Sequence, residues 1–192
     1  MAFNVLPRPA NGLYLAPVEH RQAPLFCFAL LTVSCALASF ALACATPFAA
    51  FAVIAAAMLS LRPALLVVMS AWLVNQAIGF GALHYPIDAN TMLWGLAIGA
   101  AALAATAMSA VVLRVSRQHR TPLALALALI GAYGAHELTL FAATPFLGGS
   151  AAFTAAIVTR LGLLSAIWLI ALIAACEIVR LLNPLRRGQA VS

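Results

Sequence analysis

Long uninterrupted apolar runs, separated by short polar breaks, set the pattern of this chain. The runs cover about residues 24–45, 48–61, 64–83, 92–113, 122–146 and 151–182. All but the second reach the roughly 20 residues that an α-helix needs to cross a bilayer. None alternates apolar and polar residues as the strands of a membrane barrel do. The pattern therefore predicts an all-α integral membrane protein, a single transmembrane domain over 1–192 with six transmembrane helices, of which the second is tilted, partly re-entrant or continuous with its neighbours.

The composition excludes a soluble domain. Hydrophobic residues make up 66% of the chain and charged residues 7%, with a mean hydropathy of +1.09. Soluble domains are about 45–50% apolar and about 25% charged. A soluble fold of 192 residues has too little interior for so much apolar surface. Membrane lipid is therefore the expected surrounding.

The arginines predict the orientation in the membrane. The net charge is +6, and every one of the ten basic residues is Arg. With the N-terminus inside, the inner segments hold all of them but one: Arg8, Arg21, Arg62, Arg114, Arg117, Arg120, Arg180, Arg186 and Arg187. Positive charge gathers on the cytoplasmic side of membrane proteins. Both termini are thus predicted to be cytoplasmic, with residues 1–22 as an arm and 183–192 as a tail, and the basic charge needs no nucleic-acid partner.

Polar residues cluster around the connector after the third run. Asn75 and Gln76 lie in the second half of that run, and His84, Tyr85 and Asp88 follow in the connector. Polar side chains are costly in lipid and mark functional positions there. These five residues are candidate ligand-binding residues at the outer mouth of the bundle.

Arg160 is the sixth candidate ligand-binding residue and the exception to the charge rule. It lies about nine residues from the outer end of the last run, which is about 13 Å deep. A lone intramembrane Arg is expected to face a partner or a polar cavity. Glu137, next to His136, lies at a similar depth in the fifth run. Two alternatives follow: an outward-facing cavity, or a structural Arg160–Glu137 ion pair without a ligand.

Smaller signals predict local structure. Asp88 or Asn90 is expected to cap the fourth helix, and Glu177 and Arg180 to form an i, i+3 pair. Residues 147–150 read as a tight turn. The four cysteines lie in apolar runs without a C-x-x-C pair and are expected to be buried. The small residues at 34–45 form a flat helix face, which either docks a partner protein or packs within the bundle.

No enzyme is indicated. The chain has no H-E-x-x-H, G-x-S-x-G, P-loop or dinucleotide motif. Any use of a nucleotide would therefore come from a partner.

The motifs and the architecture together resemble a known family. Six helices, a basic inner side, an Ala-rich first helix and an outward polar pocket are similar to the substrate-binding S-components of energy-coupling-factor transporters. The residues Asn75-Gln76-Ala77-Ile78-Gly79-Phe80, then Tyr85-Pro86, Thr91, Trp94-Gly95 and Arg160, resemble the solitary cobalamin-specific S-components, the BtuM family of Gram-negative bacteria. The resemblance implies binding and uptake of vitamin B12 or a related corrinoid across the bacterial inner membrane. It also implies that Ala41 and Ala45, which fit the family's A-x-x-x-A pattern, dock on an energy-coupling-factor coupling subunit that works with ATPases.

The chain departs from that family at the cobalt ligand. The family places a Cys near the connector as an axial ligand to cobalt, whereas Phe80 and Gly81 occupy that place here. We therefore expect either that His84 is the axial ligand to the corrin cobalt or that the corrin is held without protein ligation. An accessory or assembly subunit of a membrane complex, with a structural Arg160–Glu137 pair and no transport function, is the alternative function.

Overall fold

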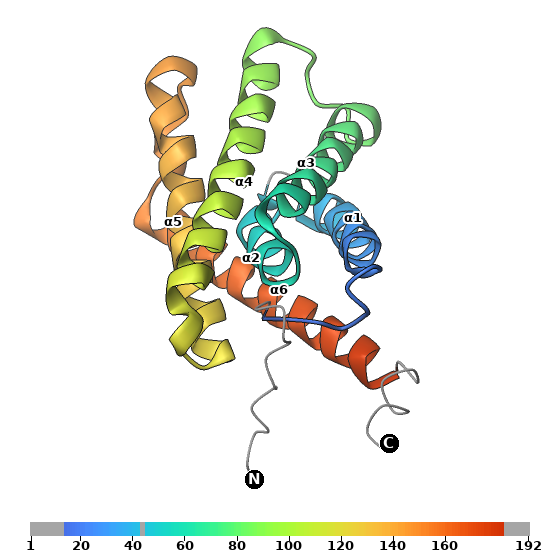
Figure 1. Ribbon diagram of the computed structural model, residues 1–192. Helices are drawn as coiled ribbons and strands as arrows, with labels where there is room; N and C mark the ends of the chain where they lie inside the picture. Colours follow the sequence, from blue (N-terminus) through green and yellow to red (C-terminus); the bar gives the residue numbers. More distant parts are fainter. Residues whose placement is uncertain (1–13, 43–44, 183–192) are drawn as a thin grey trace, which may run out of the picture.

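The structure is a computed structural model that describes residues 14–42 and 45–182 (Figure 1). All regular elements in these two ranges are helical. They are α1 (Ala23–Leu42), α2 (Phe48–Met58), α3 (Leu61–Ala77), the π-helix η2 (Ile78–Ala82), α4 (Ala89–Val115), η3 (Ser116–Gln118), α5 (Thr121–Leu147), η4 (Ser150–Ala152) and α6 (Ala155–Leu182). The prediction of an all-α protein is confirmed for the described residues.

Five of the helices are long and apolar enough to cross a membrane. They are α1, α3 with η2, α4 with η3, α5 and α6. The remaining helix, α2, has 11 residues, and at about 1.5 Å per residue it is about 16 Å long. That is about half of the roughly 30 Å hydrocarbon core. The chain therefore has the character of a multi-pass membrane protein, but α2 by itself lacks the length of a sixth span.

The backbone around Pro63 explains why α2 is shorter than its apolar run. Leu59 and Ser60 both adopt extended conformations, so the helix ends at Met58. The next helix begins at Leu61, and Pro63 lies in its first turn. A proline is tolerated there because the first backbone N–H groups of a helix have no intrahelical partner. Pro63 therefore fits the start of α3 without the loss of an intrahelical hydrogen bond.

The short helix α2 occupies the centre of the bundle. Ten of its 11 residues are buried, and it packs against α1, α3, α4, α5 and α6. Figure 1 shows α2 enclosed by its neighbours. Its apolar side chains are therefore covered by protein, which explains an apolar run that is too short to span lipid.

Side-chain contacts fix the relative directions of the helices. Cys35 in α1 donates to the Ala71 carbonyl of α3 (3.1 Å), and Asn75 in α3 donates to Ser39 in α1 (2.9 Å). The order of these contacts shows that α1 and α3 run parallel. Helices α3 and α4 follow each other directly and pack together, as do α4 and α5, so each of these pairs is antiparallel.

The last helix runs antiparallel to α1. Trp168 in α6 donates to the Ser34 hydroxyl of α1 (2.7 Å). Further along α6, Cys176 lies near Cys27, which is one turn from the start of α1. Later positions in α6 thus meet earlier positions in α1.

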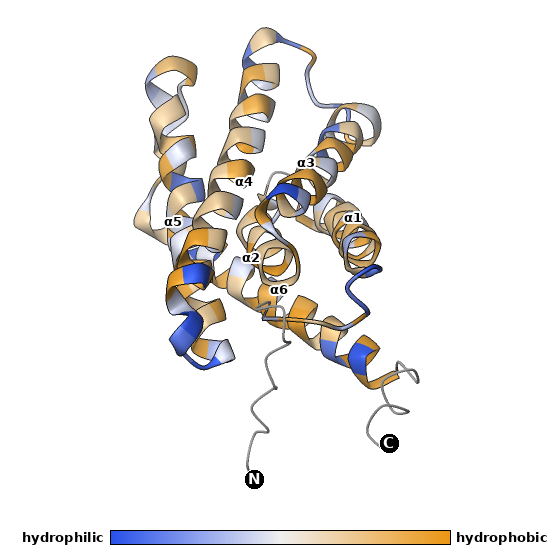
Figure 2. Cartoon of the chain, viewed as in Figure 1, coloured by the Kyte–Doolittle hydropathy of each residue, from blue (hydrophilic) through white to orange (hydrophobic). Residues whose placement is uncertain are grey.

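These directions bring the described arginines to one end of the bundle, apart from Arg160. That end contains the starts of α1, α3 and α5 and the ends of α4 and α6, and hence Arg21, Arg62, Arg114, Arg117, Arg120 and Arg180. Hydrophilic positions are visible at the α4–α5 turn and near the end of α6 in Figure 2. We call this the basic end. Its cytoplasmic location stays a prediction from the positive-inside rule.

Part of the predicted N-terminal arm packs into the bundle. The backbone N–H groups of Tyr14 and Leu15 donate to the Ala57 carbonyl at the end of α2 (3.0 and 3.1 Å). The Tyr14 hydroxyl donates to the Leu113 carbonyl of α4 (2.8 Å), and Pro17 is fully buried. Residues 1–13 of the arm and the tail at 183–192 lie outside the described residues. The sequence did not predict that residues 14–17 would cover the basic end of α2.

Several local predictions are confirmed. Asp88 caps α4 by accepting from the Thr91 backbone N–H (2.8 Å), and Glu177 pairs with Arg180 at 2.6 Å. The described cysteines Cys27, Cys35 and Cys176 are buried and unpaired, while Cys44 lies outside the described residues. The turn after α5 uses two glycines with positive φ, Gly148 and Gly149, a conformation that glycine adopts without steric cost.

Candidate functional site

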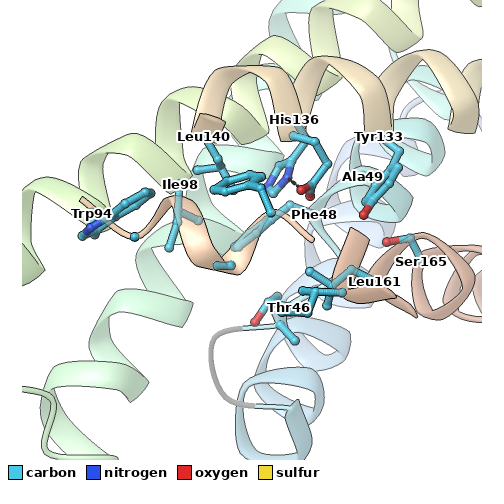
Figure 3. A pocket seen from close by; sticks show the side chains of 16 residues that line it. Thr46, Phe48, Ala49, Trp94, Ile98, Tyr133, His136, Leu140, Leu161 and Ser165 are labelled. Carbon is cyan, nitrogen blue, oxygen red and sulfur yellow. Dashed lines mark hydrogen bonds and ion pairs between the residues drawn. The ribbon is translucent and has the colours of Figure 1, made fainter. Parts of the chain in front are cut away.

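A cavity of about 320 Å³ lies between α2, α4, α5, η4 and α6. Its walls come from the starts of α2, α4 and α6 and from the middle of α5, so it occupies the half of the bundle away from the basic end. The lining residues are mostly apolar or aromatic: Ala45, Thr46, Phe48, Ala49, Trp94, Ile98, Tyr133, His136, Glu137, Leu140, Gly149, Ala152, Phe153, Ile157, Leu161 and Ser165. Figure 3 shows these side chains around the cavity. Mainly apolar walls with a few polar groups are typical of small-molecule sites.

One face of α5 supplies most of the polar groups of the cavity. Tyr133, His136, Glu137 and Leu140 are spaced i, i+3, i+4 and i+7, which places them on the same side of a helix. All four line the cavity. The rest of this long helix is almost entirely apolar, so its polar positions coincide with the cavity wall.

His136 and Glu137 form the most buried polar pair of the site. The His136 Nδ1 atom lies 3.4 Å from the Glu137 Oε1 atom, and the two side chains are 12% and 15% exposed. The imidazole stacks on Phe48, with 6.5 Å between ring centroids and 23° between ring planes. Its other nitrogen, Nε2, is buried without a hydrogen-bond partner. Buried polar atoms in proteins are nearly always partnered, so this nitrogen marks a position where a partner is missing.

Tyr133 joins α5 to α6. Its hydroxyl donates to the Val158 carbonyl at 2.6 Å, and the Glu137 carboxylate interacts with the same hydroxyl. A Cβ atom on Gly162 would lie 3.2 Å from the Tyr133 ring. The glycine therefore lets the ring approach the α6 backbone closely enough for the hydrogen bond to form.

The turn between α5 and α6 closes one side of the cavity. Gly148 and Gly149 reverse the chain, and Gly149 lies against the Trp94 indole, since a Cβ atom there would be 3.3 Å from the ring. Trp94, Gly149 and Ala152 all line the cavity. This contact between α4 and the turn gives the cavity its aromatic rim.

The predicted residues Asn75 and Gln76 lie beside this cavity and are not part of its lining. Asn75 donates to the hydroxyls of Ser39 (2.9 Å) and Thr46 (3.0 Å), and its carbonyl accepts from Gln76 (3.1 Å). Thr46 does line the cavity. Asn75 therefore ties α1 and α3 to the segment that forms one cavity wall.

The connector residues His84, Tyr85 and Asp88 lie further from the cavity. His84 is exposed and has a positive φ of 54°. The Tyr85 ring covers Gly79 in η2, where a Cβ atom would be 2.8 Å from the ring. Asp88 caps α4, and hydrogen bonds from the Thr91 backbone N–H, the Thr91 hydroxyl and the Asn90 N–H lower the pKa of its carboxyl group. None of the three lines the cavity of about 320 Å³, so their predicted ligand-binding roles rest on the sequence.

The predicted Arg160–Glu137 ion pair is not formed. Glu137 lines the cavity of about 320 Å³, whereas the exposed Arg160 lines an adjoining groove of about 1190 Å³ between the end of α1 and the start of α6. Depth along two helices predicted that they would meet, but depth does not specify which side of each helix they occupy. The groove also contains the predicted docking residues Ala41 and Ala45. The small-residue positions Ser34 and Ala38 are buried within the bundle.

The described residues do not form a metal-binding site made of protein side chains alone. They hold no group of three or more His, Cys, Asp or Glu side chains that could bind a metal ion. A protein-only zinc site needs three or four such ligands. This result does not bear on His84 as a single axial ligand to a metal held by a macrocycle.

Comparisons with family models, with curated proteins and with solved structures gave no match for this chain. The family resemblance of the motif at 75–95 therefore stays a prediction from the sequence.

Proposed function

We propose that this chain is the solute-binding subunit of a membrane uptake system, of the energy-coupling-factor S-component type. The observation that carries the proposal is the pair His136 and Glu137 on the wall of a mostly apolar cavity, with a buried, unpartnered nitrogen. Ionisable residues inside membrane-spanning helices are costly and mark substrate or ion pathways. A cavity away from the basic end faces the outer side if the arginines are cytoplasmic, which suits uptake into a bacterial cell across its inner membrane.

The sequence motif makes a corrinoid the first solute to test. The described cavity, about 320 Å³, is near the lower limit of the roughly 300–1,000 Å³ found for ligand pockets. A corrinoid macrocycle is larger than a typical drug-sized ligand, so it requires either a wider state of the cavity or a second surface. The connector with His84 and the groove with Arg160 are the surfaces that the motif favours. Ala41 and Ala45 would then contact a coupling subunit along the same groove.

The accessory-subunit alternative receives less support. It was based on a structural Arg160–Glu137 pair, and these two residues do not pair. No observation of the described residues favours it over solute binding.

Corrinoid binding can be tested with the purified full chain. The protein in detergent is mixed with cyanocobalamin or cobinamide and separated by size exclusion, while visible absorption is recorded. We expect the corrinoid to co-elute, and His84→Ala to alter the absorption spectrum if the imidazole ligates cobalt. A colourless protein fraction would refute the corrinoid as solute. If His84→Ala left the spectrum and the affinity unchanged, His84 would not be the axial ligand, but corrinoid binding itself would still stand.

A further inference from the structure

The hydrogen-bond donors and acceptors on the cavity wall indicate which class of ligand it can bind. The Glu137 carboxylate can only accept hydrogen bonds when it is ionised. The Tyr133 hydroxyl has a single proton, which it donates to the Val158 carbonyl. The hydroxyl therefore has no donor left for a ligand. The Tyr133 and Glu137 oxygens therefore present acceptors to the cavity.

The contact between His136 and Glu137 is long for an ion pair. The His136 Nδ1 atom is 3.4 Å from the Glu137 carboxylate, whereas a charge-assisted N–H···O hydrogen bond measures about 2.7–2.9 Å. The contact is therefore longer than that of a tight ion pair, and an imidazole proton on Nδ1 would point at the carboxylate. The unpartnered Nε2 is then a third acceptor. The hydroxyls of Thr46 and Ser165 can serve in either role and leave this balance unchanged.

The carboxylate also lacks a compensating charge. In the described residues its ionic contact is His136, and Arg160 lies in the other groove. A buried charge without a partner is strongly unfavourable. Aromatic rings line the same cavity, namely Phe48, Trp94, Tyr133 and Phe153. Aromatic faces attract cations, and more strongly when water is excluded.

We propose that the cavity binds a small organic cation whose N–H groups donate to Glu137 and whose apolar part lies among the aromatic rings. This inference rests on the proposed solute-binding function and names the class of solute. The cavity volume of about 320 Å³ is large enough for a molecule the size of a simple aromatic amine.

Three probes of nearly the same shape test the charge preference: benzylammonium, benzyl alcohol and benzoate. They are titrated by calorimetry into the full-length protein in nanodiscs, with empty nanodiscs as the blank. We expect benzylammonium to bind more tightly than the neutral and the anionic probe. Glu137→Gln should weaken benzylammonium binding about 10- to 100-fold, the usual loss for a charge-assisted hydrogen bond, and should leave benzyl alcohol unchanged.

Two further variants control this result. Glu177→Gln makes the same chemical change at a carboxylate that pairs with Arg180 away from the cavity, and it should bind like the wild type. Ala152→Trp fills the cavity from an exposed lining position and should abolish binding of all three probes. Size exclusion and circular dichroism check that each variant is folded, and the comparison of probes on the wild type stands even if Glu137→Gln does not fold.

The outcomes separate the ligand class from the solute-binding function. No benzylammonium binding, equal binding of benzyl alcohol or benzoate, or unchanged binding in Glu137→Gln would overturn the organic cation. The solute-binding function would survive such a result if a corrinoid or a neutral probe bound and Ala152→Trp removed that binding. If neither the probes nor a corrinoid bound the wild type, both proposals would fail.

Discussion

The contact between Gly99 and Trp72 offers a sharp test of how closely α3 and α4 approach. Gly99 is buried, and a Cβ atom added there would lie 2.8 Å from one indole carbon of Trp72 and 3.0 Å from its Nε1 atom. The same Nε1 donates to the Gly95 carbonyl at 2.9 Å. Because the clash involves the rigid ring and not a flexible chain end, Gly99→Ala must displace the indole.

The cost can be estimated from three contributions. Overpacking a well-packed core costs about 1–3 kcal/mol, and loss of the indole hydrogen bond about 0.6 kcal/mol, the average between membrane helices. Replacing Gly by Ala within a helix returns about 0.5–1 kcal/mol. Together these contributions predict that Gly99→Ala lowers the free energy of unfolding by about 0.6–3 kcal/mol. For a chain of this size this corresponds to a fall in Tm of about 1–12 °C.

Buried thiols provide the assay. Cys27, Cys35 and Cys176 are each at most 1% exposed, so a thiol-reactive fluorescent dye reaches them only as the bundle opens. The detergent-solubilised protein is heated with the dye, and Tm is the midpoint of the rise in fluorescence above its initial value.

Gly134→Ala is the matched control. Gly134 lies within α5, and an added Cβ atom would meet no other group within 4 Å. This variant should gain the full helix-propensity benefit of about 0.5–1 kcal/mol, and its Tm should rise. If both variants shifted Tm in the same direction by similar amounts, the close packing of Gly99 on Trp72 would be refuted.

Two further predictions concern Asp88 and Asn75. Hydrogen bonds to the Asp88 carboxylate lower its pKa below the ordinary value of 3.8. The charged cap therefore stabilises the folded protein above pH 3.8, and this stabilisation is lost as the pH falls through the lowered pKa. Asp88→Asn should therefore reduce Tm at pH 7 and make little difference well below pH 3.8, and an equal effect at both pH values would contradict the charged cap. Asn75→Ala removes three hydrogen bonds and should destabilise by about 2 kcal/mol at about 0.6 kcal/mol each, measured by the same dye assay. An unchanged Tm with lost ligand binding would instead indicate that Asn75 contacts the ligand directly.

The apolar pattern predicted the helices well because lipid imposes a length on each span. Helices α1, α4 and α5 begin and end within about three residues of their apolar runs, and α3 does so when η2 is included. Helix α6 begins four residues later than its run. Helix α2 differs from the others because its apolar run was read as a short transmembrane span. The helix is apolar because protein surrounds it on all sides. Sequence periodicity cannot distinguish a protein interior from lipid, because both are apolar.

The candidate site was harder to predict because it depends on helix rotation. Hydropathy gives the depth of a residue along a helix, and depth alone placed Arg160 opposite Glu137. The structure turns these side chains into different cavities. A usable signal was present in α5, where Tyr133, His136 and Glu137 share one face of an otherwise apolar helix. Trp94 and Phe48 carried no such signal, because aromatic residues in apolar runs are common.

The central position of α2 has a consequence for how the protein is made. A segment of 11 residues is too short to be retained in the bilayer by its own partitioning, since a stable span needs about 20. During synthesis it must wait for α3, α4 and α5, which emerge later from the ribosome, before its backbone and side chains are enclosed. A chain arrested before α4 would hold α2 without α4, α5 and α6, which are most of its partners, so we expect biogenesis of this protein to depend on the membrane quality-control machinery more than that of a bundle of six full-length spans.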